Sequence, residues 1–169
     1  MTGIDQQTRT AAALTALILA LGLATISGAW FFQLVIDLVP CQLCLQQRWP
    51  YYIGLPLAAI ALYLLIIGGG GLRARIILLL VAAIFLVGAG LGIYHAGVEW
   101  SFWPGPTSCA TGAGSPQNAG SLLSQMASTK VVPCDEAAWR LMGISMAGYN
   151  ALISLFLVFA AAIAARRTK

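Results

Sequence analysis

Four cysteines give this sequence its clearest capacity for chemistry, and all four lie outside its long apolar stretches. Cys41 and Cys44 form a CxxC pair in a short polar interval, whereas Cys109 and Cys134 lie in the one long hydrophilic stretch. Paired thiols can exchange electrons through mixed disulfides, bind zinc, or form disulfides that only brace a fold. The pattern therefore allows three kinds of site.

Spacing helps to separate these three kinds of site. A zinc site built from thiolates usually takes two short-spaced pairs, but Cys109 and Cys134 are far apart in the sequence, so we expect no metal. Four cysteines allow three disulfide connectivities, and sequence alone does not choose among them. Spacing favours Cys41 with Cys44 and Cys109 with Cys134 at rest. Redox activity is favoured, and structural bracing stays open.

The segments that must position these cysteines have the composition of an integral membrane protein. Hydrophobic residues make up 60% of the chain, charged residues 8%, and the mean hydropathy is +0.87, which excludes a soluble domain. A membrane-spanning helix needs about 20 apolar residues. Three stretches fit this requirement, at about 10–36, 76–94 and 141–165, and a fourth, at about 50–67, is shorter but equally apolar. They predict an all-α bundle of four transmembrane helices that forms a single membrane domain over residues 1–169.

Basic residues predict how the helices are oriented. One side of the predicted bundle holds Arg9, Arg73, Arg75, Arg166, Arg167 and Lys169, and the other holds Arg48, Lys130 and Arg140. The positive-inside rule places the first side, with both termini, in the cytoplasm. The loops at about 37–49 and 95–140, which carry every cysteine, are then outside it, where thiols oxidise. Because these cytoplasmic residues explain the net charge of +4, we expect no nucleic-acid partner.

Two further side chains lie where they could assist the cysteines. Arg48 follows Cys44 by four residues, so a helical continuation would put Cys41, Cys44 and Arg48 on one face. Pro50 suits the first turn of the second span but would kink a helix that ran through it. An arginine that reaches lipid phosphates is an equal alternative. His95, the only histidine, lies at the outer end of the third span. Its possible roles are to donate a hydrogen bond to a ligand, to relay a proton, or only to form hydrogen bonds at the membrane interface.

The tryptophans are distributed asymmetrically. All five lie at or beyond the outer ends of the predicted spans: Trp30, Trp49, Trp100, Trp103 and Trp139. An aromatic belt normally marks both membrane interfaces. The one-sided distribution indicates either a belt or a flat ligand pocket on the outer side, and the two interpretations have equal weight.

Taken together, these motifs resemble the DsbB family of bacterial disulfide-forming membrane proteins. The resemblance covers nearly the whole chain, and its motifs are specific in combination. They are Cys41-Gln42-Leu43-Cys44 with Arg48, Tyr94-His95-Ala96-Gly97-Val98-Glu99-Trp100, Trp103-Pro104-Gly105-Pro106 before Cys109, and Cys134 followed by Trp139 and Gly143-Ile144-Ser145-Met146-Ala147-Gly148-Tyr149-Asn150. Gln47 departs from the pattern, because some relatives have an acidic residue before the arginine.

The resemblance implies an electron relay in the bacterial inner membrane. A reduced, periplasmic DsbA-like thiol oxidase would attack Cys109 of a Cys109–Cys134 disulfide. Cys134 would then attack Cys41, and this step would release Cys44 as a thiolate. The order of these steps comes from the family and not from the spacing.

The resemblance also implies an electron acceptor, ubiquinone or menaquinone, bound near Arg48 and His95. Because such an acceptor is dissolved in lipid, the last cysteine of the relay must lie at the membrane surface. Cys44 meets this condition, and Cys109 does not.

Two other functions fit the same residues. An enzyme of the vitamin K epoxide reductase type also combines four helices, thiols and a quinone, although the His95 segment and the cysteine order fit it less well. A non-enzymatic membrane scaffold would use its disulfides only to brace the outer loop. The sensitivity of turnover, rather than of expression, to single cysteine substitutions separates these functions.

Overall fold

The structure is a computed structural model that describes residues 6–68, 70–106, 134–137 and 139–168. Its helices are α1 (Gln6–Leu34), α2 (Gln42–Gln46), α3 (Trp49–Ile67), α4 (Leu72–Glu99) and α6 (Met146–Arg167). Within the described residues, four helical segments are long and apolar enough to cross a membrane, and α2 and α3 together form one of them. The predicted all-α bundle of four spans is confirmed.

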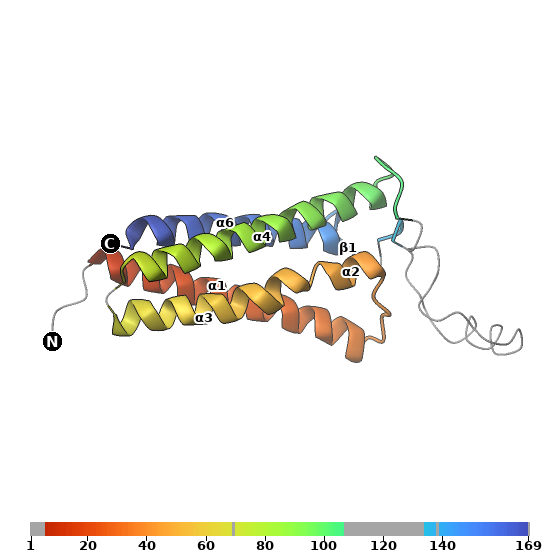
Figure 1. Cartoon of the computed structure of the whole chain (residues 1–169). Helices are drawn as coiled ribbons and strands as arrows, with labels where there is room; N and C mark the ends of the chain where they lie inside the picture. Colours follow the sequence, from red (N-terminus) through yellow and green to blue (C-terminus); the bar gives the residue numbers. More distant parts are fainter. Residues whose placement is uncertain (1–5, 69, 107–133, 138, 169) are drawn as a thin grey trace, which may run out of the picture.

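The four spans lie side by side, with different groups at the two ends of the bundle (Figure 1). The start of α1, the turn between α3 and α4, and the end of α6 lie together at one end. Arginines of the first turns of α1 and α4 and the last turn of α6 belong to this end. Helix α2, the end of α4 and the start of α6 form the opposite end. The structure therefore separates the terminal arginines from the CxxC pair along the bundle axis.

Small residues define the interior of the bundle. Lipid is as apolar as a protein core, so the helices need no polar outer face, and close packing selects small side chains inside. Buried alanines recur on all four spans, whereas large apolar side chains such as Leu72, Val87 and Phe159 are exposed. Tyr51 and Phe85 fill the centre with their rings 5.4 Å apart, edge to face. The interior thus combines small residues at close helix contacts with a few large side chains at its centre.

The fourth span begins later than the predicted residue 141. Arg140–Leu141 (β1) and Ile144–Ser145 (β2) form a two-stranded antiparallel hairpin before α6. Its turn residues, Met142 and Gly143, both have positive φ angles, of 50° and 83°, as a tight hairpin turn of this length favours. Ser145 then caps α6 by accepting a hydrogen bond from the Gly148 backbone N–H at 3.2 Å.

The third span is longer than the predicted 76–94. Helix α4 begins at Leu72, with Arg73 and Arg75 exposed in its first turn, and continues to Glu99. His95 therefore lies inside the last turns of a helix and not in the following loop. The helix can extend this far because His95 and Glu99 point inward and are buried, at 3% and 8% exposure. This extension carries polar side chains from α4 to the CxxC pair.

Packing between α4 and α6, the most extensive between any two helices of the described chain, depends on Gly92. A Cβ at Gly92 would lie 2.9 Å from the Cα and the backbone N of Ala151. Gly92→Ala is expected to lower the free energy of unfolding by about 1–3 kcal/mol, because the Ala151 backbone cannot yield without separating the helices.

Gly90→Ala is the matched control, since a Cβ there meets nothing within 4 Å. Unfolding of both variants in detergent, followed by circular dichroism, measures the difference. Equal stability of the two variants would contradict the packing argument.

Candidate functional site

The CxxC pair lies at the start of α2, where one helical turn brings the two sulfurs together. Cys41 is the N-cap of α2, with an extended backbone, and its thiol accepts a hydrogen bond from the Cys44 backbone N–H at 3.3 Å. The two Sγ atoms are 2.8 Å apart, and both thiols are free. The two sulfurs are therefore adjacent, as a reversible disulfide between them requires.

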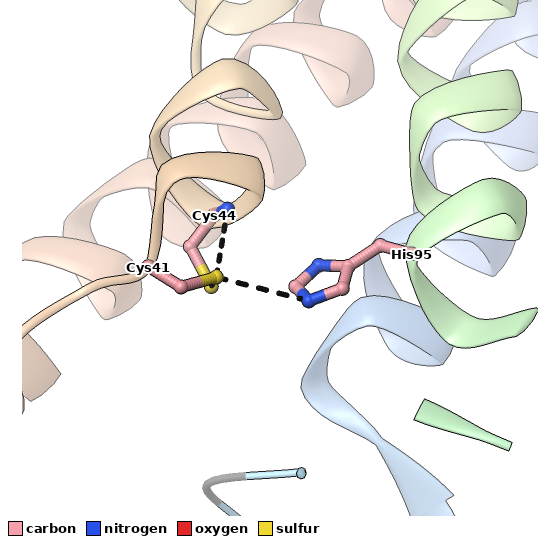
Figure 2. A group of neighbouring side chains, drawn as sticks. All are labelled: Cys41, Cys44 and His95. Carbon is pink, nitrogen blue, oxygen red and sulfur yellow. Dashed lines mark hydrogen bonds between the residues drawn. The ribbon is translucent and has the colours of Figure 1, made fainter. Parts of the chain in front are cut away.

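His95 reaches this pair from α4. Its Nε2 lies 3.8 Å from the Cys41 Sγ and 3.9 Å from Oε1 of Glu99, one helical turn further on. Figure 2 shows the imidazole pointing from α4 toward the two cysteines on α2. The ligand atoms of Cys41, Cys44 and His95 lie within 4.8 Å of one another, so these three side chains could also hold a metal ion by distance alone. Sequence reasoning singled out His95 but gave Glu99 no role.

A chain of hydrogen bonds continues from His95 into the bundle. Gln47 Nε2 lies 2.6 Å from His95 Nδ1, and Gln47 Oε1 accepts from Asn150 Nδ2 at 2.6 Å. The Tyr51 hydroxyl donates to Asn150 Oδ1 at 2.7 Å and lies 3.4 Å from the Ser154 hydroxyl. Sequence reasoning missed Tyr51, Asn150 and Ser154 as site residues. The sequence did contain a sign of their role, because polar side chains in otherwise apolar spans generally mark functional sites.

Arg48 is held by α1. Its Nη1 donates to Gln33 Oε1 at 2.6 Å, its Nη2 donates to the Ala29 carbonyl at 3.4 Å, and its guanidinium lies 5.4 Å from the centre of the Trp30 ring. Only 8% of Arg48 is exposed. A buried arginine with protein partners favours a role in the site over contact with lipid phosphates. Pro50 lies in the first turn of α3, where a proline is tolerated.

A cavity of about 810 Å³ connects these groups. Its walls are mostly apolar side chains of α1 and α6, and it is also lined by Cys41, Cys44, Gln47, Arg48, His95 and Asn150. Such a volume, with a few converging polar groups, is typical of a small-molecule site. Among the tryptophans, Trp139 lines the cavity, whereas Trp49 is 63% exposed. The tryptophans thus include both cavity and surface residues.

Cys134 lies close to the CxxC pair. It is buried in one apolar cluster with Cys41, Leu43 and Val98, and Cys44 packs against this cluster. Cys134 is disulfide-bonded, and neither Cys41 nor Cys44 is its partner, because both are free. Cys109 lies outside the described residues. The structure thus brings together Cys41, Cys44, Cys134, Arg48 and His95 of the predicted site residues.

The surroundings of Cys41 stabilise its thiolate. The hydrogen bond with the Cys44 thiol, supported by the one with His95, lowers the pKa of Cys41 to about 4, although burial acts in the opposite direction. The Cys44 backbone N–H contributes in the same sense as the two side chains. Cys41 is therefore a thiolate at neutral pH, and the thiolate is both the nucleophile and the better leaving group in disulfide exchange.

The pH dependence of alkylation in the reduced protein tests whether Cys41 is ionised. An ordinary cysteine has a pKa of about 8.5 and loses about tenfold of its thiolate per pH unit below that value. Because the pKa of Cys41 is lowered, its alkylation rate by iodoacetamide should stay nearly constant from neutral pH down to about pH 5, with modified peptides quantified by mass spectrometry. In Cys44→Ala, which removes the largest cause, the Cys41 rate should again fall steeply with pH. A steep fall in the wild-type protein would contradict the ionisation.

Comparison with known proteins agrees with this geometry. The family model described as disulfide bond formation protein DsbB matches residues 9–164, nearly the whole chain. The uncharacterized protein RP370 of Rickettsia prowazekii (strain Madrid E) is 26% identical over 147 residues, which cover 86% of this chain and 82% of the relative. No solved structure matches significantly. With its family motifs gathered at one end of a four-span bundle, the chain belongs to the DsbB family of disulfide bond formation proteins.

Proposed function

We propose that this protein is a membrane thiol oxidase that reoxidises a periplasmic DsbA-like dithiol protein and passes the electrons through its two cysteine pairs to a membrane quinone. Membership of the DsbB family supports a disulfide oxidoreductase that spans the membrane. The observation that carries the finer proposal is the cavity of about 810 Å³, because one mostly apolar space is lined by Cys44, Arg48 and His95 together.

The thiol steps balance in atoms and electrons. A thiolate of the partner attacks Cys109 of a Cys109–Cys134 disulfide and forms a mixed disulfide, which the partner's second thiol resolves. Cys134, now a thiolate, attacks Cys41 of an oxidised CxxC pair and releases Cys44 as a thiolate. Cys109 then attacks Cys134 of the Cys41–Cys134 bond, which re-forms the Cys109–Cys134 disulfide and releases Cys41. Cys41 and Cys44 re-form their own disulfide as two electrons pass to the acceptor. The burial of Cys134 in one cluster with Cys41 supports this exchange. Two electrons leave the partner dithiol in each cycle.

The cavity residues fit a quinone by their chemistry. When bound, a quinone supplies the acceptor for two electrons and two protons. Arg48 can bind and orient a carbonyl oxygen through its guanidinium, and His95 lines the same cavity with a second polar group. Either ubiquinone or menaquinone is compatible with this chemistry.

The proposed orientation places the CxxC end on the periplasmic side of the bacterial inner membrane and both termini in the cytoplasm. It is supported by the separation along the bundle axis between the terminal arginines and the cysteines. This arrangement lets a water-soluble partner reach the thiols while a lipid-soluble acceptor enters between helices.

The two alternative functions are less well supported. A scaffold braced by disulfides requires no hydrogen-bonded polar groups around its cysteines, yet His95, Gln47 and Arg48 are all buried there. An enzyme of the vitamin K epoxide reductase type would share the cavity, but the family match favours the disulfide-forming function.

Loss of the last cysteine tests the proposed relay. Purified protein in detergent, mixed under anaerobic conditions with a reduced DsbA-like partner and ubiquinone, should consume partner dithiols and quinone in equal amounts. Cys44→Ala should abolish quinone reduction, because no thiolate then faces the cavity from that position. Absorbance of the quinone and titration of partner thiols measure both. If neither ubiquinone nor menaquinone is reduced by the wild-type protein, the scaffold function is favoured instead.

Removal of the buried Arg48 guanidinium tests the proposed quinone-binding site. Arg48→Ala should raise the KM for quinone by about 10- to 100-fold, since a hydrogen bond to a charged group contributes about 1.5–3 kcal/mol. Arg75→Ala is the matched control, because it removes an exposed arginine from the other end of the bundle. Initial rates at varied quinone concentration give both values. An unchanged KM in Arg48→Ala would remove this residue from the binding site.

A further inference from the structure

We propose that Gln47 is a positioning residue that, held in place by Asn150, keeps the His95 imidazole in its Nε2–H tautomer with that N–H directed at the Cys41 sulfur. The inference goes beyond the proposed function, because it does not depend on which molecule accepts the electrons. It concerns the proton on one ring nitrogen, which decides what His95 offers to the cysteine pair.

The direction of the hydrogen-bond chain supports the proposal. The Tyr51 hydroxyl donates to Asn150 Oδ1, so the amide nitrogen of Asn150 is turned toward Gln47 and donates to its Oε1. The oxygen of Gln47 is then occupied, and its Nε2 is the atom that faces His95 Nδ1 at 2.6 Å. An amide nitrogen can only donate, so Nδ1 must accept. A neutral imidazole that accepts at Nδ1 carries its proton on Nε2.

The proton on Nε2 faces two groups that accept hydrogen bonds when charged. The Cys41 Sγ lies 3.8 Å from Nε2, and Oε1 of Glu99 lies 3.9 Å from it. The other oxygen of Glu99 is buried without a hydrogen-bond partner among the described residues. The opposite tautomer would direct a lone pair at the thiolate and the carboxylate, which is repulsive where little water screens it. The Nε2–H tautomer therefore stabilises the thiolate of Cys41.

The same tautomer disfavours metal binding by these side chains. Cys41, Cys44 and His95 have the spacing of candidate metal ligands. A histidine that binds a metal through Nε2 needs a lone pair there and normally donates its Nδ1–H to an acceptor such as a carboxylate. Gln47 presents a donor to Nδ1 instead. Gln47 thus keeps the reduced CxxC pair available for exchange in place of metal capture.

The single histidine makes the tautomer directly measurable. Reduced protein labelled with ¹⁵N-histidine contains one imidazole, and its two nitrogen signals with their couplings to the ring protons report which nitrogen is protonated. Wild-type protein is expected to show Nε2–H. An Nδ1–H signal in the wild-type protein would overturn the proposal without any substitution.

Two variants test whether Gln47 is the cause. In Q47E a carboxylate replaces the donor, so the proton should move to Nδ1. In N150D the new carboxylate should accept a hydrogen bond from Gln47 Nε2, which turns Gln47 Oε1 toward His95. The proton should then again move to Nδ1, although residue 150 has no hydrogen bond to the ring. Q33E is the matched control, since it adds the same charge to the same cavity beside Arg48. The wild-type tautomer in both Q47E and N150D would overturn the proposal.

Metal affinity provides a second measurement that a purely structural role would not alter. Cadmium titration of the reduced protein, followed by thiolate-to-metal absorption, should show tighter binding in Q47E than in the wild type. The expected increase is about 10- to 100-fold, the range associated with partners that orient a metal-ligating histidine. Q33E should bind cadmium like the wild type. Equal affinity in Q47E and Q33E would contradict the role assigned to Gln47.

Discussion

The cysteine end of this bundle depends on the cost of burying polar groups away from water. Each such group must find a partner within the protein, and here the partners come from different helices. Gln47 at the end of α2 contacts His95 on α4 and Asn150 on α6, and Arg48 is held by Gln33 on α1. These contacts join all four spans at the level of the CxxC pair. Hydrogen bonding thus positions the site, and apolar packing alone would not.

The two sulfurs of the CxxC pair have different neighbours, although only one helical turn separates them. Cys41 belongs to the apolar cluster that contains Cys134, its Sγ lies 3.8 Å from His95 Nε2, and its pKa is lowered to about 4. Cys44 packs against that cluster from outside it, and both cysteines line the cavity that Arg48 also lines. The burial of Cys41 in one cluster with Cys134 suits a relay in which Cys41 exchanges with that thiol, while the CxxC pair borders the cavity. This arrangement supports the proposed function.

Packing of the spans serves the same arrangement. Gly92 lets α4 approach the Ala151 backbone on α6, and Asn150, the preceding residue, belongs to the hydrogen-bond chain. A wider separation of the helices would draw Asn150 away from Gln47 and break the hydrogen bond between the two amides. The close contact between Gly92 and Ala151 is therefore coupled to the polar network one helical turn away. Stability of the bundle and geometry of the site cannot be altered independently at this level.

The sequence by itself determined the number of spans, the placement of the cysteines outside them and the grouping of basic residues, because hydrophobic length and charge act locally along the chain. It also singled out Arg48 and His95 near the cysteines. Only the tertiary structure decided that Asn150 and Gln47 meet, because these residues are far apart in the sequence and helix packing brings them together. Four apolar spans of similar composition do not indicate which of their side chains will be in contact. The direction of donation along the hydrogen-bond chain also depends on the tertiary structure. Each amide turns its nitrogen or its oxygen toward a neighbour according to the bond that its other end makes.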